Sequence, residues 1–442
     1  MHIQLSDHFT YKKLAQFTIP SIGMMIFTSI YGIVDGLFVS NFVGKTPFAA
    51  INLIMPYLMI LGAFGFMIGT GGNALVSRVM GEGDRQKANE IFSLLVWVSF
   101  AIGLVMTILG IVFMRPIAIL LGAEGEMLEY CVLYGNMMQT VLVAFVWQCE
   151  FQTFCVTAEK PRLGLVITVA AGLTNIVLDA LFVAVLRWGL VGAAAASAIS
   201  QLVGGVVPVI YFALPNSSAL RLVKPKWNGR ALLKSCTNGS SEMVSNLSLS
   251  LVSMLYNIQL INFAGENGVA AYGVIMYVNF IFVGIFLGYS FGVAPVVGFH
   301  YGAANHSELK SLRRKSTNIM GLGGLVLTLL AWLLSAPLSK LFVGYDTQLM
   351  EMTCHGFRIY SAAFLFMGLN MFGSSFFTAL NNGLVSAILS FVRAFGFQVI
   401  AILILPGLFG VDGIWWSIVT AEVLSLGLTV IFLAAKQKQY HY

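Results

Sequence analysis

The sequence predicts an all-α polytopic membrane protein with twelve transmembrane helices in two pseudo-symmetric six-helix lobes. Three observations support this prediction. Of the 442 residues, 58% are hydrophobic and 10% are charged, whereas about a quarter of the residues in a soluble domain are charged. The chain also contains many long apolar stretches, and its second half repeats its first half. The excess of apolar surface therefore faces lipid.

Twelve apolar stretches are long enough to cross about 30 Å of hydrocarbon as helices, at about 1.5 Å per residue. No sizeable soluble domain remains between them. The predicted spans are residues 15–41, 48–78, 91–114, 131–156, 163–186, 190–214, 236–263, 268–299, 318–342, 358–380, 384–406 and 413–435.

The two halves match each other when the chain is shifted by 221 residues, which places Gly71 on Gly292 and Gly81 on Gly302. Shared apolar composition alone would not keep these glycines in register. Each half holds an even number of spans, so both enter the membrane in the same direction. We therefore expect a pseudo-two-fold axis along the membrane normal and a substrate site between the halves. The predicted parts are a first lobe (1–219), a basic linker (220–230) and a second lobe (231–442).

Lysine and arginine residues concentrate on one side of the predicted membrane. With the N-terminus taken as cytoplasmic, the inside loops and tails hold 18 of the 24 and the outside loops hold five. This asymmetry satisfies the positive-inside rule with both termini in the cytoplasm. The net charge of +6 then reflects topology, and we expect no nucleic-acid partner. The polar first thirteen residues indicate no removable signal peptide.

The sequence offers little for an enzyme. Its five cysteines and six histidines lack the spacing of a disulfide framework or a metal site. We therefore expect no catalytic activity and no bound cofactor. A channel is less well supported, because no short filter-like re-entrant repeat is present. Two six-helix lobes around a cleft are typical of a transporter.

Six charged side chains lie well inside the predicted spans, away from their ends, where a charge costs about 3 kcal/mol. The 221-residue shift does not duplicate the acids, because Asp35 falls on Tyr256 and Asp179 on Ile400. The two halves are therefore expected to carry different functional groups and to have different functions. The six residues are Asp35, Glu150, Asp179, Glu242, Arg393 and Glu422.

Asp35 and Asp179 are the candidate ion-coupling residues. Asn175 lies four residues before Asp179 on the same helix face, and Ser197 follows a run of alanines that lets helices approach closely. Two carboxylates among amide and hydroxyl groups can hold a proton or a small hard cation such as Na⁺. The alternative is a structural polar network. Pro20 removes a backbone hydrogen bond and is predicted to bend the first span.

A second group of side chains suits the binding of flat lipophilic cations, because it combines aromatic rings, methionine and carboxylates. Packing or lipid contact is the alternative for each aromatic ring. The candidates are Trp147, Glu150, Phe151, Phe154, Asn370, Met371, Phe376 and Glu242. Glu150 needs an aqueous cleft at its depth, whereas Glu242 either lines the cleft or reaches the membrane interface. Arg393 is predicted to form an interhelix ion pair with an acid of the second lobe.

Four segments resemble the multidrug and toxic compound extrusion (MATE) family, nearer its DinF-type and MepA-like bacterial branch than its NorM type. Their order along the chain makes the resemblance specific, and it covers essentially the whole sequence. The segments are "IPSIGMMIFTSIYGIVDGLFVSNFVG" (19–44), "GGNALVSRVMGEGD" (71–84), "TAEKPR" (157–162) and "NIVLD" (175–179).

The resemblance implies a monomer with a V-shaped cleft in a bacterial cytoplasmic membrane. It implies export of drugs or toxic metabolites against entry of H⁺ or Na⁺. The matched positions are Asp35, the bending Pro20, Asn175, Asp179, Tyr134, Ser197 in place of a threonine, and Glu242 for the acid at the start of helix seven. The acid that NorM-type members carry in helix ten is missing from span 358–380, which favours protons over Na⁺. A flippase of lipids or lipid-linked precursors is the alternative function, and a non-transport scaffold is a further one.

Overall fold

The computed structural model describes residues 3–442, and every regular element in this range is helical. Two short π-helical stretches, η1 and η2, interrupt longer helices. The elements are α1 (Tyr11–Phe42), α2 (Lys45–Gly81), α3 (Arg85–Leu120), α4 (Gly125–Thr140), α5 (Leu142–Thr157), α6 (Pro161–Asp179), η1 (Ala180–Val185), α7 (Gly189–Ala213), α8 (Gly229–Gly302), α9 (His306–Val343), α10 (Thr347–Ser361), α11 (Phe364–Ala379), α12 (Gly383–Phe391), η2 (Val392–Gly396), α13 (Phe397–Phe409) and α14 (Val411–Tyr440).

Nine helical segments of the described chain are long and apolar enough to cross a membrane. Two bent helix pairs, α4 with α5 at 59° and α10 with α11 at 45°, raise the number to eleven if each pair is one span. Helix α8 has 74 residues, roughly 110 Å of helix, which far exceeds the thickness of a bilayer. Its backbone breaks at Gly265, where φ is 63° and ψ is −154°. The 221-residue shift places Gly265 on Gly44, which also has a positive φ.

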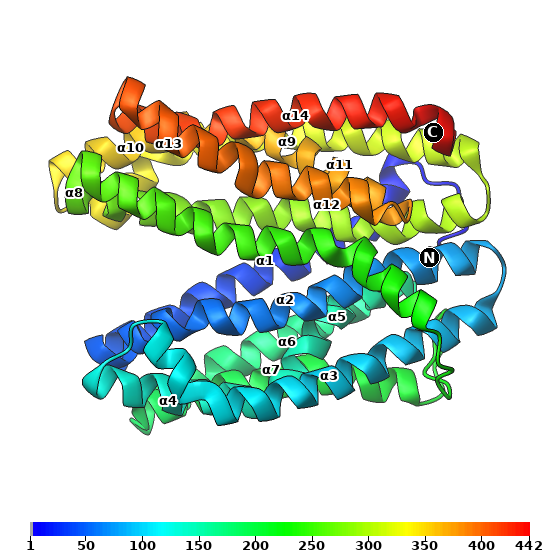
Figure 1. Cartoon of the computed structure of the whole chain (residues 1–442), viewed down its shortest axis with the longest axis horizontal. Helices are drawn as coiled ribbons and strands as arrows, with labels where there is room; N and C mark the ends of the chain where they lie inside the picture. The colour runs from blue at the N-terminus through cyan, green and yellow to red at the C-terminus, as the bar shows by residue number, and fades with distance from the viewer. Residues whose placement is uncertain (1–2) are drawn as a thin grey trace.

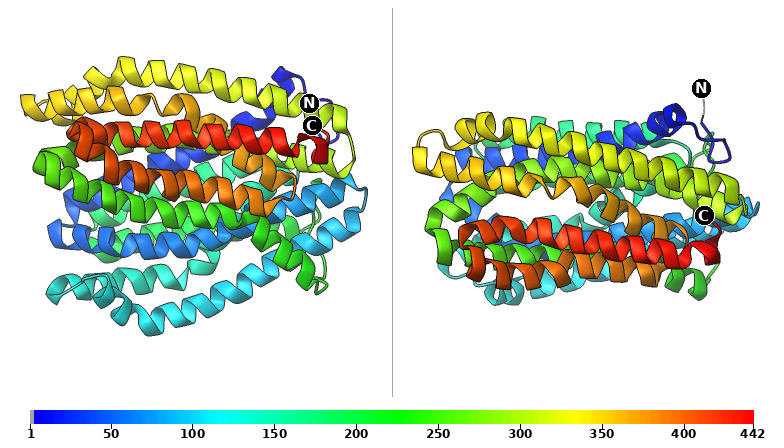
Figure 2. Two further views of the ribbon diagram at one scale, coloured as in Figure 1. Left: turned by 45° about the horizontal axis from the view of Figure 1, so that its top comes forward. Right: turned by 90° about the horizontal axis from the view of Figure 1, so that it is seen from above.

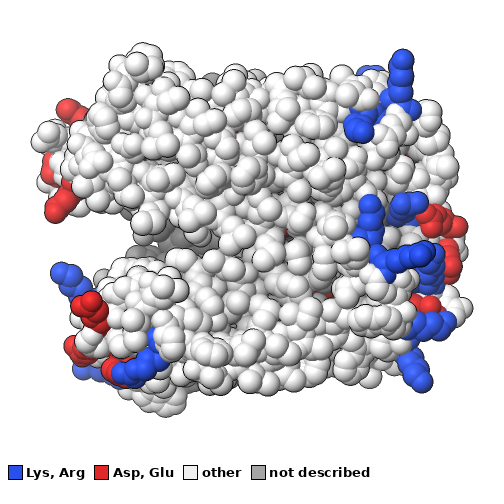
Figure 3. Space-filling model, in the orientation of Figure 1, with Lys and Arg blue, Asp and Glu red and all other residues white. Residues whose placement is uncertain are grey.

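The helices form two groups that follow the halves of the sequence. In Figure 1, α1–α7 lie in the lower part and α9–α14 in the upper part, with α8 along the boundary. Figure 2 shows both chain ends at the same end of the bundle. Most of the lysine and arginine side chains visible in Figure 3 gather at that end, and a hollow separates the two groups at the other end.

Glycines let α2 and α8 meet backbone to backbone at the basic end. Gly81 lies against the carbonyl oxygen of Phe299, and Gly302 lies against that of Arg78. The 221-residue shift relates Gly81 to Gly302 and Arg78 to Phe299, so the contact is reciprocal. A Cβ atom at either glycine would collide with the facing oxygen, and only glycine permits this approach.

The segment before α1 ties both halves together at the same end. The backbone N–H of Leu5 donates to Glu159 Oε1 at 2.8 Å, in the turn between α5 and α6. The backbone N–H of Phe9 donates to Glu308 Oε1 of α9 at 2.9 Å, and His8 Nδ1 lies 2.6 Å from the other oxygen of Glu308. This segment therefore bridges the first and the second half.

Gly302→Ala tests the contact between α2 and α8. The added methyl group collides with the Arg78 carbonyl, so we expect it to lower the free energy of unfolding by about 1–3 kcal/mol. Thermal unfolding of the detergent-purified protein measures this loss. The control is Gly321→Ala in α9, where a Cβ meets open space and alanine improves helix propensity. Equal melting temperatures for the two variants would contradict the contact.

Candidate functional site

Close packing of α1 on α6 builds the first polar site. Gly172 of α6 leaves room for the rings of Phe27 and Tyr31 of α1. This packing brings Asp35 of α1 close to Asp179, the last residue of α6. The two predicted coupling acids therefore meet across one helix interface.

The other residues predicted for ion coupling lie around these two acids. Asn175 is close to Asp35, and its Nδ2 donates to Ser197 Oγ of α7 at 3.4 Å. Tyr134 of α4 is buried, and it lies close to Ser197 and near both aspartates. Four helices thus contribute to one polar cluster, whose role in coupling stays a prediction.

Three of the four oxygens of these two carboxylates have no hydrogen-bond donor within the described chain. Asp179 is fully buried, and no group within residues 3–442 donates to either of its oxygens or to Asp35 Oδ1. Burying charged carboxylates side by side without donors is costly unless a proton or a cation neutralises them. The arrangement therefore suits a site that takes up a proton or a small monovalent cation. The described residues hold no group of three or more His, Cys, Asp or Glu side chains suited to a metal ion.

Two further side chains belong to this cluster and were not predicted. Tyr31 lies close to Gln148 of α5 and near Asp35. Gln148 is buried, and its amide has no hydrogen-bond partner within the described chain by distance and angle. The spacing of four residues between Tyr31 and Asp35 indicates a shared helix face, so this pair was accessible to sequence analysis.

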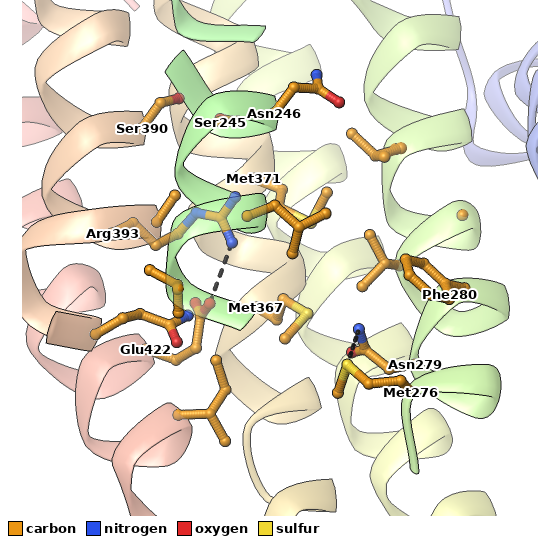
Figure 4. A pocket seen from close by; sticks show the side chains of 18 of the residues that line it. Ser245, Asn246, Met276, Asn279, Phe280, Met367, Met371, Ser390, Arg393 and Glu422 are labelled. Carbon is orange, nitrogen blue, oxygen red and sulfur yellow. Dashed lines mark hydrogen bonds and ion pairs between the residues drawn. The ribbon is translucent and has the colours of Figure 1, made fainter. Parts of the chain in front are cut away.

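The second site is a cavity of about 340 Å³ that lies mainly in the second half. This volume is within the range of small-molecule sites. Both segments of α8, helices α10–α14 and η2 line it, together with Met25, Thr28 and Ser29 of α1. Figure 4 shows Arg393, Glu422, Asn279 and the methionines around this space.

The predicted ion pair of Arg393 is confirmed and lies in the cavity lining. Arg393 Nη1 is 3.1 Å from Glu422 Oε1. Glu422 is fully buried, and its Oε2 accepts a hydrogen bond from Asn370 Nδ2 at 2.7 Å. Asn370 was predicted to contact substrate, but in the structure its side-chain amide donates a hydrogen bond to Glu422. Glu242 lines the same cavity from α8.

Of the eight predicted substrate residues, only Glu242 and Met371 line this cavity. The aromatic side chains of α5 pack elsewhere: the rings of Phe151 and Phe212 stack at 5.6 Å, and Phe154 packs edge-on to Phe92 at 5.0 Å. They cover each other because edge-to-face and offset contacts bury their apolar area within the first half.

Three further predicted substrate residues, Trp147, Phe376 and Glu150, also lie outside the cavity and contact other parts of the protein. Trp147 Nε1 donates to the Val96 carbonyl at 3.2 Å, and Phe376 packs against Tyr442 at 5.0 Å. Glu150 is fully buried and does not line the cavity. The close approach of Gly69 to the Glu150 backbone seals α2 against α5 there. The aqueous cleft expected at Glu150 is not what the structure shows, and substrate contact by these residues stays a prediction.

Helix α1 connects the two sites. Ser29 lines the cavity, and its hydroxyl donates to the Phe280 carbonyl of α8 at 3.3 Å. Asp35 follows six residues later on the same helix, about 9 Å along its axis. Helix α1 is continuous through Pro20, so the bend at this proline stays a prediction. A movement of α1 at Asp35 would therefore also move the α1 residues that line the cavity.

The fold and the two sites define a polytopic helical membrane protein built from two repeated halves. The model of the MatE family matches residues 20–181 and 243–404, more than half of the chain. The chain belongs to the MatE family. The two matches start at residues 20 and 243, within two residues of the 221-residue shift, which confirms the internal repeat. Members of this family are transporters and not enzymes.

Relatives and solved structures cover nearly the whole chain. The chain is 24% identical to the multidrug export protein MepA of Staphylococcus haemolyticus (strain JCSC1435), over 96% of this chain and 93% of the relative. It is also 24% identical to MepA of Staphylococcus aureus (strain N315), over 94% and 91%.

Two solved structures have the same fold. A MATE crystal structure in complex with MaL6 superposes with a TM-score of 0.93 at 21% identity and 98% coverage of both chains. The outward-facing conformation of a multidrug resistance MATE family transporter of the MOP superfamily gives 0.92 at 22% identity, over 98% of this chain and 97% of that chain.

A double-mutant cycle tests the ion pair. Glu422→Leu leaves the Arg393 guanidinium without its charge partner, so we expect the free energy of unfolding to fall by about 3 kcal/mol. Replacing both residues by leucine removes the uncompensated charge and should cost less than the two single changes together. Chemical unfolding in detergent measures all three variants, and additive losses would show that the two side chains do not stabilise each other.

Proposed function

We propose that the protein is a secondary active multidrug exporter that exchanges lipophilic, mainly cationic, small molecules for a cation by alternating access. The observation that carries this proposal is the closeness of two carboxylates, the half-buried Asp35 and the buried Asp179, with three of their four oxygens lacking a donor within the described chain. The MepA relatives are named multidrug export proteins. Helix α1, which carries Asp35, also lines a cavity of small-molecule size.

The proposed architecture has twelve spans in two six-span lobes, over residues 3–219 and 231–442. The eleven segments counted above become twelve when α8 is divided at Gly265 into two spans. The reciprocal contacts of Gly81 and Gly302 support a two-fold relation between the lobes. The basic end faces the cytoplasm by the positive-inside rule, so both termini are cytoplasmic and the hollow of Figure 3 opens outward.

In the proposed mechanism, a proton entering from outside is shared by Asp35 and Asp179 and reduces the charge of the pair from −2 to −1. The loss of charge repulsion changes how α1 packs on α6, and α1 transmits the change to the cavity through Thr28 and Ser29. Coupling requires that proton and drug prefer different states, since a ligand that binds both states equally shifts nothing. Protons are favoured because two carboxylates without donors can share one, and Na⁺ is the alternative ion.

The first experiment follows a fluorescent cationic dye in proteoliposomes under imposed pH or Na⁺ gradients. We expect a pH gradient alone to drive dye movement in the wild type and not in Asp35→Asn, because the amide cannot take up the coupling proton. Asp412→Asn is the control, since this exposed carboxylate pairs with His355 away from the cluster, and it should transport like the wild type.

Each outcome of this experiment has a defined meaning. If Asp35→Asn inserts normally into the membrane and moves the dye like the wild type, Asp35 does not take part in coupling. Movement driven only by Na⁺ would keep the site and change the ion. If neither gradient moves dye, the lipid-flippase alternative replaces drug export.

A further inference from the structure

The segment that joins the two halves is fixed along the first turns of α3. This joining segment, residues 214–230, runs from the end of α7 into the first turn of α8, and Figure 1 shows it at the end of the bundle where α3 begins. The backbone N–H of Arg221 donates to Asn89 Oδ1 at 3.0 Å. One turn further along α3, Ser93 Oγ accepts from the backbone N–H of Val223 at 2.8 Å. The segment therefore has a defined place on the surface of the first half.

The face of α3 that holds the joining segment becomes lipid-exposed within one further turn. Asn89, Ser93 and Trp97 are spaced four residues apart and therefore share this face. Trp97 is 55% exposed and lies about 6 Å beyond Ser93 along the helix axis. Exposed apolar side chains such as Val105 and Ile108 follow it. Because tryptophan gathers where a membrane meets water, the joining segment lies at the level of the lipid headgroups.

Cations cover the outer surface of the joining segment. Residues 214–230 contain Arg221, Lys224, Lys226 and Arg230, all exposed, and no aspartate or glutamate. Lys226 Nζ pairs with Glu90 of α3 at 2.6 Å. The side chains of Lys224 and Arg230 have no hydrogen-bond or ion-pair partner within residues 3–442. The segment therefore presents positive charge that the protein does not neutralise.

A large apolar side chain lies among these cations. Trp227 is 79% exposed, more than any other tryptophan of the described residues, and its ring stacks on no other ring of the same residues. An indole in this position is unfavourable in water but suits the headgroup region, where its apolar body and its N–H group both find partners. The nearby acids are already engaged: Asp84 caps α3 by accepting from the Lys87 N–H at 2.9 Å, and Glu90 holds Lys226.

We propose that the joining segment binds anionic phospholipids of the leaflet at the basic end, with headgroup phosphates on Lys224 and Arg230 and the Trp227 ring between the headgroups. Clustered cations at a membrane surface attract anionic lipids. A zwitterionic lipid brings no net charge to balance these cations. The inference concerns the surface of the joining segment alone and is independent of the ion and the substrate of the proposed exporter.

The first test measures lipid selectivity by native mass spectrometry of the full-length protein in detergent. Phosphatidylglycerol and phosphatidylcholine with the same acyl chains are added in equal amounts, and the readout is the ratio of the two bound lipids. We expect the wild type to prefer phosphatidylglycerol. The double variant Lys224→Gln with Arg230→Gln should lose this preference by about fivefold for each charge removed.

The matched control is Lys12→Gln with Lys438→Gln, which removes the same charge from the same end of the molecule. Both lysines are exposed and have no side-chain partner within the described residues, and both chain ends lie at this end (Figure 2). This variant should keep the wild-type ratio. Thermal unfolding checks that both double variants are folded, and we expect unchanged melting temperatures because none of the four side chains makes a contact that the fold needs.

The second test measures the depth of Trp227 in nanodiscs. The difference in emission between the wild type and Trp227→Phe isolates the signal of this indole. We expect phosphatidylcholine that is brominated near the headgroup to quench this signal, and aqueous iodide to leave most of it, because the ring lies among lipids.

Four results would overturn the proposal. A wild type without lipid preference, or equal losses in the two double variants, would reduce the effect to overall charge. Quenching of Trp227 by iodide and not by brominated lipid would place the joining segment in water. Release of bound phosphatidylglycerol by inorganic phosphate would assign the cations to a soluble anion in place of a lipid.

Discussion

The close contact of α2 with α8 is the constraint on which the rest of the structure depends. Gly81 and Gly302 let the two backbones meet in a reciprocal way, and Gly71 and Gly239 extend the contact along the same helices. Because these glycines lack a Cβ atom, the halves are held by backbone approach and van der Waals contact, which drive helix association where lipid provides no hydrophobic force. The contact lies at the basic end, and the space between the halves opens at the other end (Figure 3).

Helix α1 belongs to both halves in its packing. Thr18 and Ile22 lie against Gly292 and Gly288 of α8, whereas Phe27 faces Gly172 of α6. The small residues on each partner let α1 approach both sides closely. A movement of α1 against α6 would therefore also change its contacts with α8, and the proposed mechanism uses this packing to link the aspartate pair to the cavity of the second half.

The repeat duplicated the helical scaffold but not its charges. In the first half, Asp35 and Asp179 lie close together, and three of their four oxygens have no donor within the described chain, which suits the uptake of a proton or a cation. In the second half, Glu422 is neutralised by Arg393, a cation that the protein supplies itself. The first pair is the one that we propose responds to an ion gradient, whereas the second is a fixed ion pair within the protein.

The sequence by itself determined the helical membrane class, the repeat and the charged pairs. A charge at bilayer depth is so costly that it needs an opposite charge or a bound ion, and the ion pair of Arg393 with Glu422 follows from this. Asp35 and Asp179 carry like charges, and their closeness fits the prediction of a site that holds a proton or a cation. Only the tertiary structure decided where the aromatic residues face, because rings such as Phe151 lower their free energy equally well in a core, in lipid or in a cleft. The cavity location was decided in the same way, since it depends on how α1 packs against both halves.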